Sequence, residues 1–185
     1  MSSRVAWVTS CCSFTACNVA EKAAYTLDTV AQQVRSWKAQ GLKVVFTNGV
    51  FDVLHVGHVE VLEVAASHGQ KLVVGVNSDA SVRRLRKGPD RPIHEEGNRA
   101  RVLAALRSVD AVVVFEDDTP LALVNSLQPD VLVKGGDYDE ACTDENDPRY
   151  MVGSAELKAW GGHAVAVPLV PGQSTTATIK KIRTS

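Results

Sequence analysis

Two histidines three residues apart, His55 and His58, are the residues in this 185-residue chain best placed to do chemistry. They follow a short apolar run that ends at Phe46 and precede apolar residues at helical spacing, so they fall where a strand leads into a helix. Free backbone N–H groups and the helix dipole favour an anion at that position. Imidazole N–H groups on one turn can hold a phosphate that gains negative charge in a transition state. Gly57 between them leaves room for a nucleotide to approach the backbone.

A histidine pair at this spacing can instead bind a metal ion or cap the helix. A metal ion needs a third Cys, His or carboxylate ligand, and only Asp52 is close enough in the sequence. The four cysteines, Cys11, Cys12, Cys17 and Cys142, form no zinc-binding spacing. We therefore favour a phosphate site, because a strand, a glycine-bearing loop and a helix follow one another here.

A basic segment from Arg83 to Arg91 supplies further candidates for phosphate binding. It holds five Lys and Arg residues within nine positions, with Gly88 and Pro89 near its end. This composition predicts a mobile loop that closes on a triphosphate or a sugar phosphate. A solvated basic face is the alternative for any one of these side chains.

Three other segments place polar residues in the stretches that follow apolar runs. Ser174 is a natural helix N-cap, and the hydroxyl and amide groups of Ser174–Thr176 can bind a second phosphate. Asp137 follows two glycines, where its carboxylate can hydrogen-bond a ribose or sugar hydroxyl, help to hold Mg²⁺, or simply form the turn. Ser78 and Asp79 are expected to cap a helix, with a sugar contact as the alternative.

The elements that must position these residues are five short apolar runs separated by helix-like segments. Such runs suit strands that are buried on both faces of a parallel sheet. The strands are expected at 44–46, 72–76, 111–115, 131–133 and 164–167, and the helices at 26–40, 59–67, 98–107 and from Thr119-Pro120 through Leu127. This order predicts an α/β fold, a doubly wound, Rossmann-like and mostly parallel five-stranded sheet with helices on both faces. Ligands of such sheets bind at the carboxyl ends of the strands, where the candidate residues lie.

Composition narrows the class of protein. Apolar residues make up 45% of the chain, as in globular domains, and 20 Lys and Arg against 21 Asp and Glu argue against binding to bulk nucleic acid. No apolar run is long enough to span a membrane. The cysteines do not form a secreted disulfide framework, so a cytoplasmic location is expected. We expect a loosely attached N-terminal extension over residues 1–25 and one domain over residues 26–185.

The block His55-Val56-Gly57-His58 resembles the HxGH signature of the nucleotidyltransferase superfamily. Four further blocks, at 46–52, 76–81, 132–138 and 174–176, resemble the adenylyltransferase of ADP-heptose synthesis, and the resemblance covers about residues 26–183. It implies transfer of AMP from ATP to D-glycero-D-manno-heptose 1-phosphate for lipopolysaccharide or capsule precursors, with release of pyrophosphate. It also implies Mg²⁺ held mainly by the ATP phosphates, and a homo-oligomer, either a dimer or a tetramer.

The resemblance also implies roles for individual residues. It places His55, His58, Lys87 and Arg99 in catalysis, against the phosphates. It assigns the nucleotide to residues of several loops, namely Thr47, Asn48, Gly49, Val50, Phe51, Gly57, Asp137, Ser174, Thr175 and Thr176. It assigns the sugar phosphate to Asn77, Asp79, Lys134 and Gly135.

Two other functions fit the same blocks. A cytidylyltransferase that acts on a polyol or amino-alcohol phosphate uses the same HxGH chemistry. A non-catalytic nucleotide-binding regulator can share the fold, although one histidine or the 174–176 turn would then be expected to be lost. Val50 replaces a Cys that the heptose family often carries, and the connection at 139–149 is longer and more acidic than usual. The sequence contains no kinase domain, so the phosphorylated sugar is expected to come from another protein.

Overall fold

The five predicted strands form one sheet in which every neighbouring pair is parallel. The computed structural model describes residues 22, 25–85, 88 and 90–184. The strands are β1 (Val44–Gly49), β2 (Lys71–Asn77), β3 (Ala111–Phe115), β4 (Val131–Gly135) and β5 (His163–Val167), and their order across the sheet is β3-β2-β1-β4-β5. In the centre, Val45 of β1 pairs with Leu72 of β2 on one side and with Val131 of β4 on the other. The predicted α/β class is confirmed.

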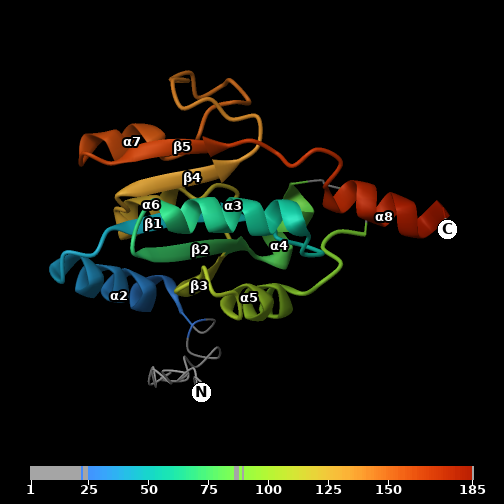
Figure 1. The fold of residues 1–185 in the computed structure, drawn as a ribbon, viewed down its shortest axis with the longest axis horizontal. Helices are drawn as coiled ribbons and strands as arrows, with labels where there is room; N and C mark the ends of the chain where they lie inside the picture. The colour runs from blue at the N-terminus through green and yellow to red at the C-terminus, as the bar shows by residue number, and fades with distance from the viewer. Residues whose placement is uncertain (1–21, 23–24, 86–87, 89, 185) are drawn as a thin grey trace, which may run out of the picture.

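Helices cover both faces of this sheet, as predicted. Helices α2 (Leu27–Ala39), α6 (Leu121–Leu127) and α7 (Ser154–Ala159) pack on one face, and α3 (Val56–Ser67) and α5 (Glu96–Ala104) pack on the other. Because side chains of a strand alternate between faces, Leu72, Val74 and Val76 join the core under α3 and α5, while Val73 joins the opposite core. Figure 1 looks onto the α3 face.

All four predicted helices start at slightly different residues in the structure. Helix α2 begins at Leu27, one residue after the predicted start at 26, and α5 begins at Glu96, two residues before the predicted start at 98. Helix α3 begins three residues before the predicted start at 59, because His55 already has the extended backbone of an N-cap and its carbonyl oxygen accepts the amide of His58 at 2.9 Å. The prediction that Thr119 caps a helix beginning at Pro120 is wrong by one residue. Helix α6 begins at Leu121, since the carbonyl of Pro120 at the N-cap accepts the first helical hydrogen bond, from Val124.

The predicted extension at residues 1–25 lies outside the described residues except for Lys22 and Tyr25. Lys22 Nζ donates a hydrogen bond to the carbonyl of Val109 at 2.6 Å, and Tyr25 forms a parallel bridge with Val113 of β3. Both described residues therefore contact the edge of the domain next to β3.

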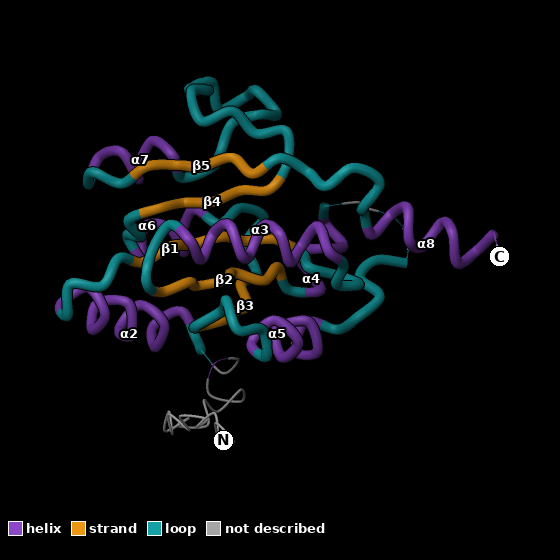
Figure 2. The backbone as a smooth tube through the Cα atoms, in the orientation of Figure 1, coloured by secondary structure: helices purple, strands orange, loops and turns teal. Residues whose placement is uncertain are grey.

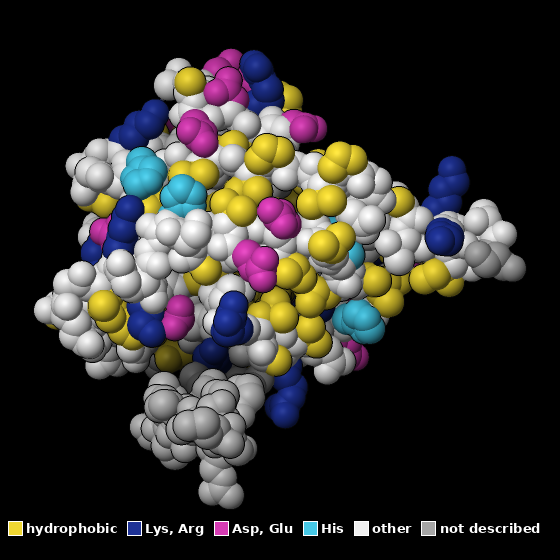
Figure 3. Space-filling model, in the orientation of Figure 1, with side chains coloured by type: hydrophobic (Ala, Val, Ile, Leu, Met, Phe, Trp, Pro, Cys, Tyr) yellow, Lys and Arg dark blue, Asp and Glu magenta, His cyan; other side chains and the backbone are white. Residues whose placement is uncertain are grey.

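The carboxyl ends of the strands face the same side of the molecule, and the loops that follow them meet there (Figure 2). The chain leaves β1 for β2 through α3 on one face and reaches β4 through α6 on the other face, which opens a crevice between β1 and β4. Helix α4 (Asp79–Arg84) follows β2 at this edge, and α8 (Thr175–Thr184) projects from it (Figure 1). Only Thr175 of α8 is buried, and Lys and Arg side chains lie on its outer part (Figure 3).

Candidate active site

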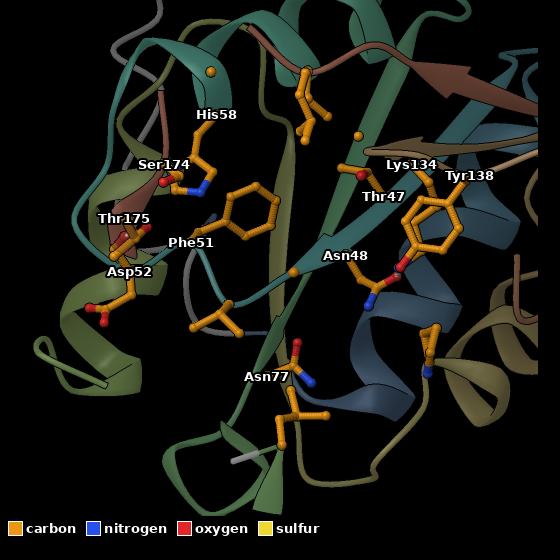
Figure 4. Close-up of a pocket in the computed structure, with 18 of the residues that line it drawn as sticks. Thr47, Asn48, Phe51, Asp52, His58, Asn77, Lys134, Tyr138, Ser174 and Thr175 are labelled. Atoms are coloured by element: carbon orange, nitrogen blue, oxygen red, sulfur yellow. Dashed lines mark hydrogen bonds between the residues drawn. The ribbon is translucent and has the colours of Figure 1, made fainter. Parts of the chain in front are cut away.

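The polar residues at the carboxyl ends of β1, β2 and β4 surround a cavity of about 580 Å³. Its walls come from the loop after β1, the first turn of α3, the ends of β2 and β4, Tyr150 and Val152, and the turn before α8. Figure 4 shows two sides of this cavity. One side holds Phe51, His58, Ser174 and Thr175, and the other side holds Asn48, Lys134 and Tyr138. All the predicted nucleotide residues except Asp137, and all the predicted sugar-phosphate residues except Asp79, line this cavity.

The two histidines lie together at the amino end of α3. His55 occupies the N-cap without making a side-chain cap, and its ring stacks on the ring of His58 with the centroids 3.8 Å apart. The ring of Phe51 meets His58 edge-on, with the centroids 5.4 Å apart. Burial lowers the pKa of His55 below its ordinary value, so this imidazole is neutral at pH 7 and offers one N–H group. Both rings line the cavity next to the free amides of a helix N-terminus, an arrangement suited to a phosphate.

Gly57 permits this stacked arrangement by having no side chain. A Cβ atom at Gly57 would lie 3.1 Å from the Nδ1 and Cε1 atoms of His55 and 3.6 Å from the Cβ of Gln173. The space above Gly57 therefore lies between the histidine ring and the turn before α8, which are two of the walls of the cavity.

The turn before α8 uses its three hydroxyl groups differently. Ser174 Oγ accepts the amide of Ala177 at 3.1 Å, as expected for an N-cap. Thr175 is buried, and its hydroxyl donates to the backbone carbonyl of Asp52 at 2.8 Å, which fastens the turn to the loop after β1. The exposed Thr176 hydroxyl has no hydrogen-bond partner among the described residues and lines the cavity.

A buried lysine lies on the other side of the cavity. Lys134 is 8% exposed, and its Nζ donates to Asn48 Oδ1 at 2.6 Å, so the ends of β4 and β1 are joined through their side chains. The same Nζ lies 5.6 Å from the centroid of the Tyr138 ring, within the range of a cation–π contact. This side of the cavity therefore offers a positive charge at its base and an aromatic wall.

Arg99 does not line this cavity, contrary to its predicted role against the phosphates. The Arg99 side chain is only 1% exposed. It donates to the backbone carbonyls of Val50, Asn77 and His94 at 2.6, 2.7 and 2.9 Å, and its Nη2 also lies 2.7 Å from Asp79 Oδ1. Arg99 therefore fixes the backbone at the ends of β1 and β2.

Three other predicted site residues are placed as follows. Asp79 pairs with Arg99, and its amide donates to Glu96 Oε2, so its carboxylate faces the interior of the domain and not the cavity. Asp137 is exposed and lies outside the cavity lining, although Gly135, two residues before it, belongs to the lining. Lys87 lies outside the described residues.

The structure adds cavity residues to which the sequence assigned no individual role. They are Arg91, Tyr138, Tyr150, Val152, Leu169 and Gln173, among others. Arg91 is the last residue of the basic segment and Tyr138 is the last residue of the block at 132–138, and both memberships were available signals. The sequence around Tyr150 and Val152 shows no pattern that would indicate a site, because these residues reach the cavity only through the path of the long connection after β4.

In the described part of the chain, no group of three or more His, Cys, Asp or Glu side chains could hold a metal ion. None of the helices described between residues 22 and 184 has the length and apolarity that crossing a membrane requires.

Comparisons with known proteins show the family of this chain. The cytidylyltransferase-like family profile matches residues 46–180. The bifunctional protein HldE of Methylobacillus flagellatus is 51% identical over 156 residues, which are 84% of this chain and 30% of that protein. HldE of Mesorhizobium japonicum is 56% identical over 153 residues, or 83% of this chain and 29% of that protein. The chain thus spans about 30% of the length of these relatives.

Two solved structures share the fold. The lipopolysaccharide core biosynthesis protein of Thermoplasma volcanium is 28% identical with a TM-score of 0.54, over 70% of this chain and 98% of that one. Pantoate–β-alanine ligase of Francisella tularensis is 15% identical with a TM-score of 0.55, over 85% of this chain and 72% of that one, and this likeness concerns the fold alone. The profile match covers the strands, the HxGH turn and the turn before α8, and the chain belongs to the cytidylyltransferase-like family.

Proposed function

We propose that this chain is a nucleotidyltransferase that transfers AMP from ATP to D-glycero-D-manno-heptose 1-phosphate, forming ADP-heptose and pyrophosphate. One observation carries the proposal: a single cavity holds His55, His58 and the Ser174–Thr176 turn on one side and Lys134 on the other. Two phosphate-bearing substrates can therefore meet in it. The relatives named HldE and the structure named as a lipopolysaccharide core biosynthesis protein support a sugar phosphate as the acceptor.

The chemistry needs alignment and charge stabilisation more than proton transfer. The acceptor phosphate oxygen is already anionic, so it can attack the α-phosphorus in line without a general base. We assign His55 and His58 to the α-phosphate and the leaving-group oxygens, where N–H donors stabilise the growing charge. The turn at the start of α8 would hold the pyrophosphate end, and Lys134 would hold the acceptor phosphate. Lys87 stays a predicted phosphate ligand.

Mg²⁺ would neutralise and bridge the ATP phosphates when they bind. The described cavity lining contains two carboxylates, those of Asp52 and Asp118. Asp52 is fully buried with both oxygens engaged, and Asp118 pairs with Arg84 at 2.6 Å. Because both carboxylates already have partners, the cavity suits a Mg²⁺ ion that enters bound to the ATP phosphates and takes few ligands from the protein.

The test is pyrophosphate release by the purified chain with each of the four NTPs and a panel of sugar 1-phosphates and polyol phosphates. The proposal expects activity with ATP and the heptose phosphate, and none in the His55→Ala/His58→Ala double variant. Activity with CTP and a polyol or amino-alcohol phosphate would replace it with the cytidylyltransferase function that the family profile also allows. Nucleotide binding without pyrophosphate release for any pair would indicate a regulator.

A cytoplasmic location and a homo-oligomeric state stay predictions from the sequence. Light scattering coupled to size-exclusion chromatography measures the oligomeric state.

A further inference from the structure

The most deeply buried carboxylate of the cavity, Asp52, binds a neighbouring segment and not the cavity. Asp52 is 0% exposed. Its Oδ2 accepts the amide of Ile93 at 2.8 Å, its Oδ1 accepts the amide of His94 at 3.0 Å, and Arg91 Nε lies 2.7 Å from Oδ2. Burial alone would raise the pKa of Asp52, but the two amides and the Arg91 guanidinium outweigh it and hold the pKa below its ordinary value. Asp52 is therefore a charged anchor for residues 91–94.

The backbone around Asp52 is strained, and contacts from outside the loop hold it. Phe51 and Val53 have φ values of 50° and 51°, a region that bulky and β-branched residues rarely adopt. Such backbone conformations are energetically unfavourable and persist only where the surroundings impose them. Here Thr175 donates to the Asp52 carbonyl, and Arg99 donates to the Val50 carbonyl. The amide of Ile93 donates to the Asp52 carboxylate.

Arg91 is the partner of Asp52 that reaches the cavity. Its side chain is 9% exposed and lines the cavity together with His55, His58 and Ser174. Its two terminal nitrogens have no hydrogen-bond partner among the described residues. The contact of Arg91 Nε with Asp52 Oδ2 is an ion pair without a hydrogen bond, and it keeps the guanidinium beside the buried carboxylate. The terminal nitrogens of a guanidinium form a planar fork suited to phosphate oxygens.

We propose that Asp52 is a positioning residue, which orients the Arg91 guanidinium so that its terminal nitrogens hold the nucleotide phosphates. This proposal rests on the proposed function and adds Arg91 as a phosphate ligand. The nucleotide, not the acceptor, is the partner, because Thr175 ties Asp52 to the turn at the start of α8 and not to Lys134. Asp52 is not a general base, since both carboxylate oxygens already accept N–H groups.

A double-mutant cycle with Asp52→Asn and Arg91→Met tests the coupling. Each single variant should lower kcat/KM for ATP by about 10–100-fold, the usual effect of losing a hydrogen bond to a charged group, while the KM for the acceptor stays unchanged. The double variant should be no worse than Arg91→Met, because Asp52 acts through Arg91. Asp90→Asn is the matched control, since Asp90 is exposed, adjoins Arg91 and pairs with Arg183 of α8 instead.

Three results would overturn the proposal: Asp52→Asn folded with unchanged ATP kinetics, losses that add in the double variant, or a loss in Asp90→Asn equal to that in Asp52→Asn. If Asp52→Asn does not fold, Arg91→Lys decides, because it keeps the charge and loses the fork. It should raise the KM for ATP about tenfold with a melting temperature within about 4 °C of the parent, and an unchanged KM would refute the proposal.

Equilibrium binding of ATP·Mg²⁺ separates this proposal from the proposed function. If the parent chain releases no pyrophosphate with any acceptor, the proposed function fails. Weaker ATP·Mg²⁺ binding by Asp52→Asn and Arg91→Met, with binding by Asp90→Asn unchanged, would still support the positioning role, and equal binding by all of them would refute it.

Discussion

At the scale of single residues, the proposed chemistry rests on the two stacked imidazoles of His55 and His58. His58→Ala should lower kcat by about 100-fold or more, because removing one donor to the charge of a transition state costs roughly 3–4 kcal/mol. Steady-state kinetics measures this, and a thermal melt establishes that the variant is folded. His68→Ala is the matched control, since His68 lies at the carboxyl end of the same helix and outside the cavity lining. An unchanged kcat in folded His58→Ala would contradict the assignment.

His55 also makes stability depend on pH. Burial lowers its pKa below the ordinary value of 6.5, so below about pH 6.5 the unfolded chain binds more protons at this residue than the folded chain. Stability should therefore fall as the pH drops through that range. His55→Asn removes this titrating group. Urea unfolding measured at pH 8 and at pH 5.5 should therefore show that the parent chain loses more stability than the variant when the pH is lowered from 8 to 5.5. An equal loss of stability in the parent chain and the variant would rule out His55 as the source of this pH dependence.

At the scale of elements, the approach of α3 to β4 places the histidines over the strand ends. Gly135 permits it, because a Cβ there would lie 2.4 Å from Cγ2 of Val61, one turn after His58. Val61 is stiff at χ1, so Gly135→Ala should displace α3, lower stability by about 1–3 kcal/mol and reduce kcat. Adding Val61→Ala to this variant should restore part of the stability and part of kcat. Gly97→Ala, whose Cβ would meet no atom within 4 Å, should leave both unchanged or raise stability by up to about 1 kcal/mol. Gly135→Ala with the stability of the parent chain would refute this packing argument.

At the scale of the whole molecule, one cavity with two proposed phosphate-binding sides favours a single displacement. No Cys or Ser in the HxGH loop is placed as a nucleophile, and the acceptor phosphate is an adequate one. Both substrates should therefore bind before pyrophosphate leaves, giving sequential kinetics and inversion at a chiral α-thiophosphate. Isotope exchange between pyrophosphate and ATP without acceptor, or retention of configuration, would instead indicate an adenylylated histidine.

The sequence by itself determined the architecture and the location of the candidate site. Apolar runs are local features, and their Val-rich, non-alternating pattern follows from burial on both faces, so the five strands lie where they were predicted. The HxGH block and the Ser174 cap are also local, because a helix terminus needs its own nearby residues to satisfy its amides. Their positions after strands were enough to place them at one edge of the sheet.

Only the tertiary structure decided what the charged side chains do there. Arg99 has the position in sequence of a phosphate ligand, yet its acceptors come from Val50, Asn77, Asp79 and His94, which the fold brings together inside the domain. The sequence offers Asp52 as a candidate metal ligand, whereas in the structure it is the anchor of residues 91–94. The direction and partners of a long charged side chain depend on backbone groups that are distant in the sequence, so no local pattern records them.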